Sequence, residues 1–170
     1  MTETQKALNK FRDTIVNEAK ANLKSMGKDS TGKLSKSIQG QVKEMPNSIS
    51  MYFQMETYGY FQDVGVSGIK KKYNTPFSYT TKMPPPSKLD KWIVRKGIAP
   101  RDKKGKLMSR KGLQFAIARG IFMNGIKPTL FFTKPFEKAF KKLPDTLITK
   151  YGLDAEQLFD SIMKETITKK

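Results

Sequence analysis

The sequence contains no cysteine and no histidine among its 170 residues. Without cysteine the chain forms no disulfide and offers no thiolate. Zinc and copper sites are usually built from these two residue types, so such sites are essentially excluded. Catalytic triads that depend on histidine are excluded for the same reason. We therefore predict no metal centre of this kind and no bound cofactor.

Long apolar runs are also missing. No stretch of the sequence approaches the ~18 apolar residues that cross a bilayer, and residues 1–5 lack the basic and then apolar pattern of a signal peptide. We expect a protein that is made and assembled in a cytoplasm and has no membrane partner. The hydrophobic fraction is only 37%, which favours a modest core with long polar extensions.

Acidic residues are scarce relative to basic ones. Fifteen Asp and Glu face 33 Lys and Arg, which gives a formal net charge of +18. Such an imbalance costs self-repulsion in the compact state and favours polyanionic partners. Nucleic acid and an acidic protein surface both fit, and so does a merely solvated lysine-rich surface, because lysine is the common surface cation. Composition alone leaves these three alternatives open.

The acids that are present do not form a recognisable catalytic pattern. They are scattered, mostly beside lysines, and no cluster suited to Mg²⁺ is seen. Glu56 and Asp63 are the nearest approach to a carboxylate pair. The segment 30–33 reads Ser-Thr-Gly-Lys but lacks the earlier glycine of a phosphate loop, and no Gly-x-Ser-x-Gly is present. We predict that the protein is not an enzyme.

The first third of the chain predicts a helix followed by a β-hairpin. Apolar residues recur every three to four positions over residues 5–26, Thr2 and Gln5 form a capping-box pattern, and Gly27 is a suitable stop. Alternating apolar and polar residues predict strands at 38–44 and 48–56. We therefore predict an α+β fold, in which a small antiparallel sheet packs against a long N-terminal helix, with additional helices and long loops.

The remainder alternates between loops and helices. An aromatic stretch covers 58–65 and leads into an irregular, lysine-bearing and proline-rich loop at 65–86, which is long enough to predict an interaction loop. Ser87 predicts the start of a short helix, anchored to the core by Trp92. A basic linker follows at 100–112.

Three more helices are predicted beyond the basic linker. One runs from about Ser109 to the stop at 124–125, a second covers 136–147, where Pro144 ends one helical stretch and begins the next, and a last one is capped by Asp154. Between the first two, residues 126–136 hold three phenylalanines and two prolines. The prolines exclude a central strand, and the phenylalanines need burial in this chain or against a neighbour.

Three segments in order resemble a known family. Residues 29–38 read Asp-Ser-Thr-Gly-Lys-Leu-Ser-Lys-Ser-Ile, residues 58–65 read Tyr-Gly-Tyr-Phe-Gln-Asp-Val-Gly, and residues 134–139 read Lys-Pro-Phe-Glu-Lys-Ala. They are similar to the "DTGxLxxSI", "YAxYxExGT" and "PFLxPA" segments of the tail-completion and head–tail joining proteins of long-tailed bacteriophages. The order and rough spacing agree over about residues 5–142. The lysine-rich form also resembles neck proteins of crAss-like phages.

The chain departs from the family pattern in several places. Ser30 is inserted in the first segment, Asp63 replaces the usual glutamate of the second, and no Gly-Thr follows. Residues 70–125 form a larger insertion than the family usually carries. The resemblance implies a single tail-completion-like domain over 1–150, with a long loop or insertion at about 65–125, and a C-terminal helix or extension over 151–170.

The resemblance also implies a function. The chain would be a structural subunit of the virion neck, in a closed homo-oligomeric ring on the order of six or twelve copies. The ring would join the portal or adaptor to tail proteins and surround the DNA channel. The candidates for the contact between subunits are Tyr60, Phe61, Phe77, Tyr79, Phe131, Phe132 and Phe136. The candidates for facing DNA are Lys70, Lys71, Lys72, Arg101, Lys103, Lys104, Lys106 and Arg110. The alternatives are a non-specific nucleic-acid-binding protein and a small nuclease.

Overall fold

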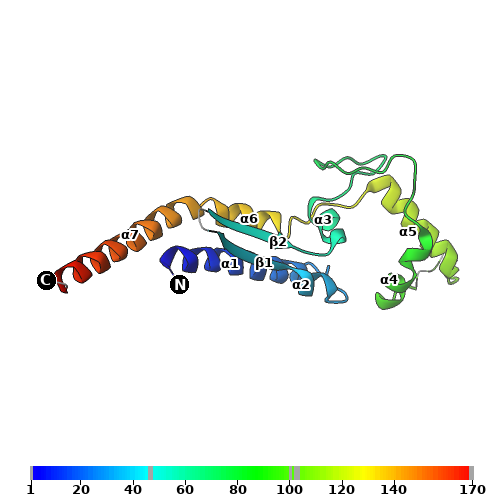
Figure 1. Ribbon diagram of the computed structural model, residues 1–170. Helices are drawn as coiled ribbons and strands as arrows, with labels where there is room; N and C mark the ends of the chain where they lie inside the picture. The colour runs from blue at the N-terminus through cyan, green and yellow to red at the C-terminus, as the bar shows by residue number, and fades with distance from the viewer. Residues whose placement is uncertain (1, 46–47, 100, 102–103, 169–170) are drawn as a thin grey trace. The chain divides into compact units, whose positions relative to one another are not determined.

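The computed structural model describes residues 2–45, 48–99, 101 and 104–168. It has the predicted α+β fold, with a long N-terminal helix and a two-stranded antiparallel sheet packed together (Figure 1). The chain forms two compact units. The first consists of Met1–Glu56 and Phe131–Lys170, and the second of Thr57–Leu130. The insertion predicted at 65–125 falls inside the second unit.

Helix α1 spans Glu3–Ser25 and is closed at both ends by local hydrogen bonds. At its start the predicted capping box is present, because Thr2 and Gln5 each accept a backbone N–H of the other. At its end Gly27 has a φ of +61°, and its N–H donates to the carbonyl of Lys24 while that of Lys28 donates to Leu23. This Schellman arrangement stops the helix where the sequence predicted a stop.

The core of the first unit lies on one face of α1. Ile15, Ala19 and Leu23 are fully buried. Helix α2, Lys33–Ser37, adds Leu34, and the residue after it, Ile38, is also fully buried. Phe131 joins this cluster from the far end of the chain, and its carbonyl accepts a hydrogen bond from Asn22 in α1. The sequence brings the first and last thirds together by burying apolar residues from both.

Strands β1, Gln39–Met45, and β2, Ser48–Gln54, form the hairpin. Gly40 pairs with Phe53 and Val42 with Met51, so these residues share one face of the sheet. Phe53 lies edge-on to Phe132 and Phe136 of the α6 region, with ring centroids 5.4 and 6.1 Å apart. This aromatic contact fixes which face of the hairpin is covered.

The last helices of the first unit begin earlier than predicted. Helix α6 spans Thr133–Phe140, and α7 runs without a break over Leu143–Thr168 (Figure 1). Pro144 lies in the first turn of α7, where its missing N–H costs nothing. The prediction that Asp154 caps a separate last helix is wrong, because Asp154 lies in the middle of α7. The C-terminal extension predicted from residue 151 is the distal part of that helix.

The second unit contains helices α3, Thr57–Val64, and α5, Arg110–Asn124, with a short helical segment between them. That segment consists of the 3₁₀ turn η1, Pro86–Leu89, and helix α4, Asp90–Arg95. The prediction that Trp92 anchors this segment is wrong. Trp92 is 37% exposed, and the neighbouring Ile93, at 3%, is the buried residue. A helix this short buries only one narrow stripe, and Ile93 occupies it.

Helix α5 and the segment after it close the second unit. Helix α5 begins next to Ser109, as predicted, and the hydroxyl of Ser109 caps it by accepting the N–H of Gly112 at 3.1 Å. Beyond the helix Ile126 exchanges two backbone hydrogen bonds with Val66, which ties the end of α5 to the end of α3. Within the described parts of the chain, no helix is long and apolar enough to cross a lipid bilayer.

Candidate interaction surfaces

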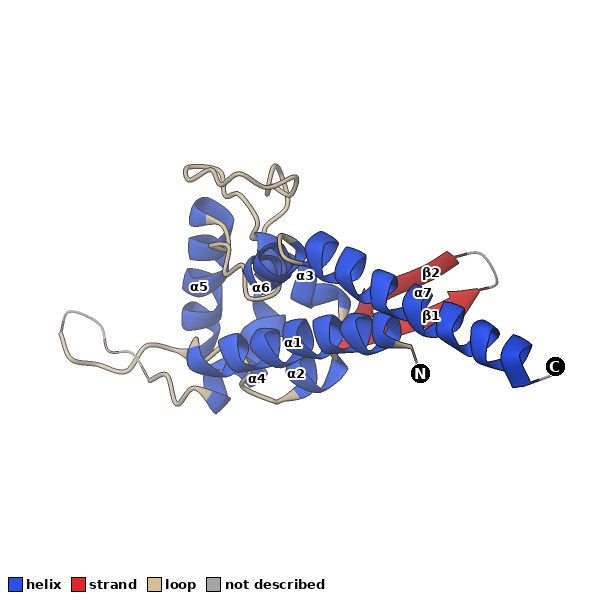
Figure 2. Ribbon diagram, turned by 90° about the vertical axis from the view of Figure 1, so that its left-hand side faces the viewer, coloured by secondary structure: helices blue, strands red, loops and turns tan. Residues whose placement is uncertain are grey.

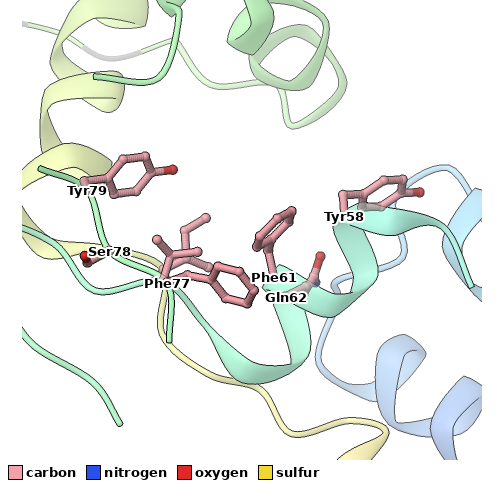
Figure 3. Close-up of a pocket in the computed structure, with 8 residues that line it drawn as sticks. Tyr58, Phe61, Gln62, Phe77, Ser78 and Tyr79 are labelled. Carbon is pink, nitrogen blue, oxygen red and sulfur yellow. The ribbon is translucent and has the colours of Figure 1, made fainter. Parts of the chain in front are cut away.

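The second unit carries an apolar groove of about 500 Å³ beside α3, which we call the aromatic groove (Figure 3). Four of its lining residues are aromatic, and Tyr58 and Tyr79 lie at its two ends in the close-up. Phe61 and Phe77 lie between them. The full lining consists of Tyr58, Phe61, Gln62, Val66, Phe77, Ser78, Tyr79 and Ile126.

The wall of the aromatic groove is held by Ser67, which is buried. Its backbone N–H donates to the carbonyl of Phe77, and its carbonyl accepts the N–H of Tyr79, both at 2.8 Å. Its hydroxyl accepts the N–H of Tyr73 at 2.9 Å and donates to the carbonyl of the same residue at 3.1 Å. One serine therefore folds the loop after α3 back on itself and places two aromatic side chains in the wall.

The aromatic side chains of this wall pack at steep angles. Phe61 and Phe77 have ring centroids 4.7 Å apart at 75°, and Tyr60 meets Phe77 at 5.5 Å and 85°. Edge-to-face pairs of this kind are favourable because the ring edge is positive and the ring face is negative. Burial raises the pKa of the Tyr79 hydroxyl above its usual value, so that hydroxyl is neutral and able to donate a hydrogen bond.

The first unit carries a second apolar groove of about 510 Å³, which we call the α1/α7 groove. Two of its residues are among the most exposed large apolar side chains described: Ile148 is 73% and Tyr151 71% exposed. Figure 2 shows α7 running beside α1 next to the hairpin. The lining comes from all three elements: Thr4, Leu8, Ile49, Met51, Leu147, Ile148 and Tyr151.

Asp154 closes one end of this region by capping α1 from outside. Its carboxylate accepts the N–H groups of Glu3 and Thr4 at 2.7 and 2.9 Å, and the Thr4 hydroxyl at 2.7 Å. These bonds, led by the one from the Thr4 hydroxyl, hold the pKa of Asp154 below its usual range. Lys150 lies 3.4 Å from the carboxylate of Glu3. Polar contacts thus join the first turn of α1 to α7.

The predicted interface residues fall into two groups. Tyr60, Phe61, Phe77 and Tyr79 all belong to the second unit, and three of them line the aromatic groove, while Tyr60 is half exposed beside it. The other three lie in the first unit. Phe131 is fully buried in the core of its own chain, and so offers no surface to a neighbouring subunit. Phe132 and Phe136 stack with ring centroids 6.1 Å apart and are partly buried.

The predicted DNA-facing residues also divide. Lys70, Lys71 and Lys72 are exposed in one loop, and the ammonium of Lys71 lies 5.8 Å from the ring centre of Tyr73. Arg110 is committed to Asp90, with Nε 2.6 Å from one carboxylate oxygen and Nη2 3.2 Å from the other. A bidentate pair of this kind reduces the charge available to a phosphate.

The remaining cations come from the basic linker. Arg101 donates to the carbonyl of Gly105 at 2.8 Å, in a small loop closed by a bridge between Arg101 and Leu107. Lys104 and Lys106 are exposed. Lys103 lies outside the described residues. The structure thus brings Lys70–Lys72 together and places the linker cations in a separate loop of the same unit.

The side chains of the described residues include no group of three or more acids placed to hold a metal ion. Glu56, which the sequence singled out with Asp63, instead pairs with Lys33 at 3.1 Å. Asp63 is buried at the end of α3, where its carbonyl accepts the N–H groups of Thr129 and Leu130 at 3.1 and 2.9 Å.

Sequence reasoning missed the α1/α7 groove. Leu147 and Tyr151, with Ile148 between them, are spaced as neighbours on one helical face, and this spacing was a usable signal. The predicted helices end at 147 and begin again at Asp154, so residues 148–153, Ile148 and Tyr151 among them, lie outside both. Asp154 was singled out, but for its own helix.

We found no family model, no curated protein and no solved structure that matches this chain.

Proposed function

We propose that this protein is a structural subunit of a tailed-phage neck, which assembles as a closed ring between the portal or adaptor and the tail, around the path of the DNA. The three ordered segments that resemble tail-completion and head–tail joining proteins motivate the proposal. The chain acts by binding neighbours and performs no catalysis in this reading.

One observation carries the proposal further than the resemblance does: the chain has two dissimilar open apolar grooves. The aromatic groove belongs to the second unit and the α1/α7 groove to the first. Subunits of a closed ring meet through heterologous interfaces, so each subunit needs two different surfaces. Exposed apolar grooves are a common feature of sites where proteins associate. A protein that functions as a soluble monomer would not need two such grooves.

Two of the three segments that carry the resemblance contribute to the packing of the first unit. Leu34 and Ile38, from the first segment, are fully buried against Phe131. Phe136, from the third, packs on Phe53 of the hairpin. These contacts stabilise a scaffold, and they leave the two grooves and the loop at 70–72 free to meet neighbours or DNA.

Two experiments test the proposal, one on purified virions and one on the purified chain. Mass spectrometry of purified virions should detect the chain, and imaging of the neck with an antibody or tag should place it between head and tail. The purified chain, at increasing concentration, should give ring-shaped particles in electron micrographs and a single high oligomer in native mass spectrometry. Absence from virions would exclude this function.

A second function, non-specific binding of nucleic acid, is favoured by the net charge of +18 and by the exposed lysines at 70–72. Phosphate contacts of this kind are independent of sequence and weaken steeply with salt. Tight binding of duplex DNA by the isolated monomer at near-physiological salt, without ring formation, would favour this alternative. A ring that binds DNA only weakly at that salt would favour the neck subunit.

A further inference from the structure

The hairpin has two outer edges that the rest of the described chain leaves unpaired. The sheet contains only β1 and β2, so each strand has a partner on one side alone. No backbone hydrogen bond from another described segment reaches the outer side of either strand. Both strands are seven residues long and pair in register along their whole length. The outer edges therefore present two matched rows of backbone donors and acceptors.

The edge of β2 lacks the features that normally protect such a strand. Proteins that stay monomeric blunt their edges with charge, proline or a bulge, because an open edge can pair with another chain. The sequence of β2, Ser-Ile-Ser-Met-Tyr-Phe-Gln, has no charged residue, no proline and no glycine. Strand β1 carries one charge of each sign, Lys43 and Glu44. An unprotected edge of this length is a surface on which another strand can pair.

The charge of the hairpin is compatible with a second copy of this chain as the source of such a strand. Each copy has a formal net charge of +18, so two copies repel one another except where their surfaces carry no excess positive charge. Strand β2 is uncharged and the two charges of β1 cancel, so the hairpin edges are places where a second copy can approach. The edges also fit one another, since they come from strands of equal length in one hairpin.

The two faces of the hairpin have opposite characters. The covered face carries Phe53 and Met51 against the helices. The other face is exposed along most of its length and contains no carboxylate. Its polar side chains bond to one another across the strands: Tyr52 donates to Gln41, and Gln54 to Gln39. Lys43 is the one charged side chain on that face. Such a face is compatible with a polyanion, which an acidic face would repel.

We propose that copies of this chain join hairpin to hairpin, with the outer edge of β1 in one copy pairing antiparallel with the outer edge of β2 in the next. Copies related by rotation about a ring axis present their strands in alternating directions, so the pairing continues around the ring. Closure leaves no free edge. The exposed, carboxylate-free face then lines the DNA path, and the helices lie outside. This inference rests on the proposed ring.

A symmetric alternative makes a different prediction. Pairing of β2 with β2 of a second copy would produce a two-fold dimer and leave both β1 edges open. That arrangement removes only half of the exposed edge. The two pairings can be separated by cross-linking, because the chain has no cysteine and any introduced thiol is the only one in its copy.

The experiment uses two single variants of the full chain, Lys43→Cys in β1 and Ser50→Cys in β2. Both residues lie on the exposed face, and they are opposite one another within one hairpin. The proteins are mixed, assembled and treated with a short bismaleimide. The proposal predicts a cross-linked species in the mixture that is several-fold more abundant than in either variant alone. Lys43→Cys mixed with Tyr52→Cys, and Gln41→Cys mixed with Ser50→Cys, cover a shift in pairing by two residues in either direction.

The outcomes separate this inference from the ring itself. Cross-linking of Ser50→Cys with itself at the level of the mixture supports the symmetric pairing and overturns the proposal. A ring in electron micrographs without cross-links in any mixture overturns strand pairing and leaves the ring intact. A chain that stays monomeric at all concentrations overturns both. As a second variant, Ser50→Lys adds a protecting charge to β2 and should abolish assembly while the circular dichroism of the monomer is unchanged. Unimpaired assembly would count against the proposal.

Discussion

The carboxylate of Asp154 accepts hydrogen bonds from both the backbone N–H and the hydroxyl of Thr4, a residue 150 positions earlier in the sequence, at 2.9 and 2.7 Å. The first N–H groups of a helix have no partner within it, and the N-terminus carries a partial positive charge. Asp154 satisfies two of these groups from the middle of another helix. This contact fixes the position of α7 along the axis of α1. It thereby places the α7 residues that line the α1/α7 groove.

Replacing Asp154 by alanine should lower the stability of the first unit at neutral pH. The pKa of Asp154 is lowered in the folded state, so its contribution is complete above the unfolded-state value, which is about 3.9 for aspartate. It is lost as the pH falls through the lower folded-state pKa. In urea denaturation the variant should have a lower unfolding free energy than the unmodified chain. This difference should be constant between neutrality and about pH 5 and should shrink in more acidic solution.

The control for this variant is Glu156→Ala, an exposed acid two residues further along the same helix. It removes the same charge without touching α1 and should change stability little. A deficit for Asp154→Ala that did not shrink on acidification would show that the carboxylate contributes through something other than its ionised form.

Lys6 should respond to pH in the opposite direction. The hydrogen bond to Glu3, at 2.6 Å, raises the pKa of Lys6. Its contribution is therefore present below the usual lysine range and is lost as the pH rises through the raised folded-state value. Lys6→Gln should cost little, because both side chains of the pair are solvated. The difference in unfolding free energy between this variant and the unmodified chain should disappear only in strongly alkaline solution.

Truncating Phe131 should destabilise the chain severely, because its side chain is fully buried among Ala19, Leu23 and Leu34. Phe131→Ala leaves a cavity and should cost about 3–5 kcal/mol of unfolding free energy, measured by urea denaturation. Phe140→Ala is the matched control, since Phe140 is 52% exposed and should cost well under half as much. Equal effects would show that Phe131 is not a core residue.

Adding one methyl group at Gly40 should also destabilise the fold. A Cβ there would lie 2.5 Å from Cγ of Arg12 and 2.9 Å from a ring carbon of Phe53. Relieving this overlap should cost about 1–3 kcal/mol. Gly152→Ala is the control, because a Cβ at Gly152 meets nothing within 4 Å. That change, in the interior of α7, should raise stability by about 0.5–1 kcal/mol, and both effects are measurable by thermal and urea denaturation.

Removing the three lysines at 70–72 should weaken any contact with DNA in a way that depends on salt. If all three meet phosphates, the slope of log K against log salt should lose up to about 2.7 in magnitude. The control removes three exposed lysines of the first unit, Lys24, Lys28 and Lys36, by the same alanine substitutions. Fluorescence anisotropy with duplex DNA would measure both. Identical losses would show that net charge, and no particular loop, governs binding.

The sequence by itself determined the local elements of this protein. Helix α1 and its two ends, the hairpin register and the capped start of α5 follow from interactions within a few residues: the Thr2–Gln5 capping box, the left-handed Gly27, the alternation in β2 and the hydroxyl of Ser109. Such patterns are readable because each partner lies close in the chain. They were sufficient to predict an α+β fold with a helix packed on a small sheet.

Only the tertiary structure decided which side chains meet. Ile93 is buried in place of Trp92 because a single narrow stripe of α4 has space to pack, and the sequence does not state which. Phe131 is buried in its own chain because Ala19, Leu23 and Leu34 arrive from the other end of the sequence. Asp154 caps α1 because α7 continues past residue 150 and reaches it. These contacts depend on how distant segments pack, which local propensity does not specify, and the two grooves depend on the same packing.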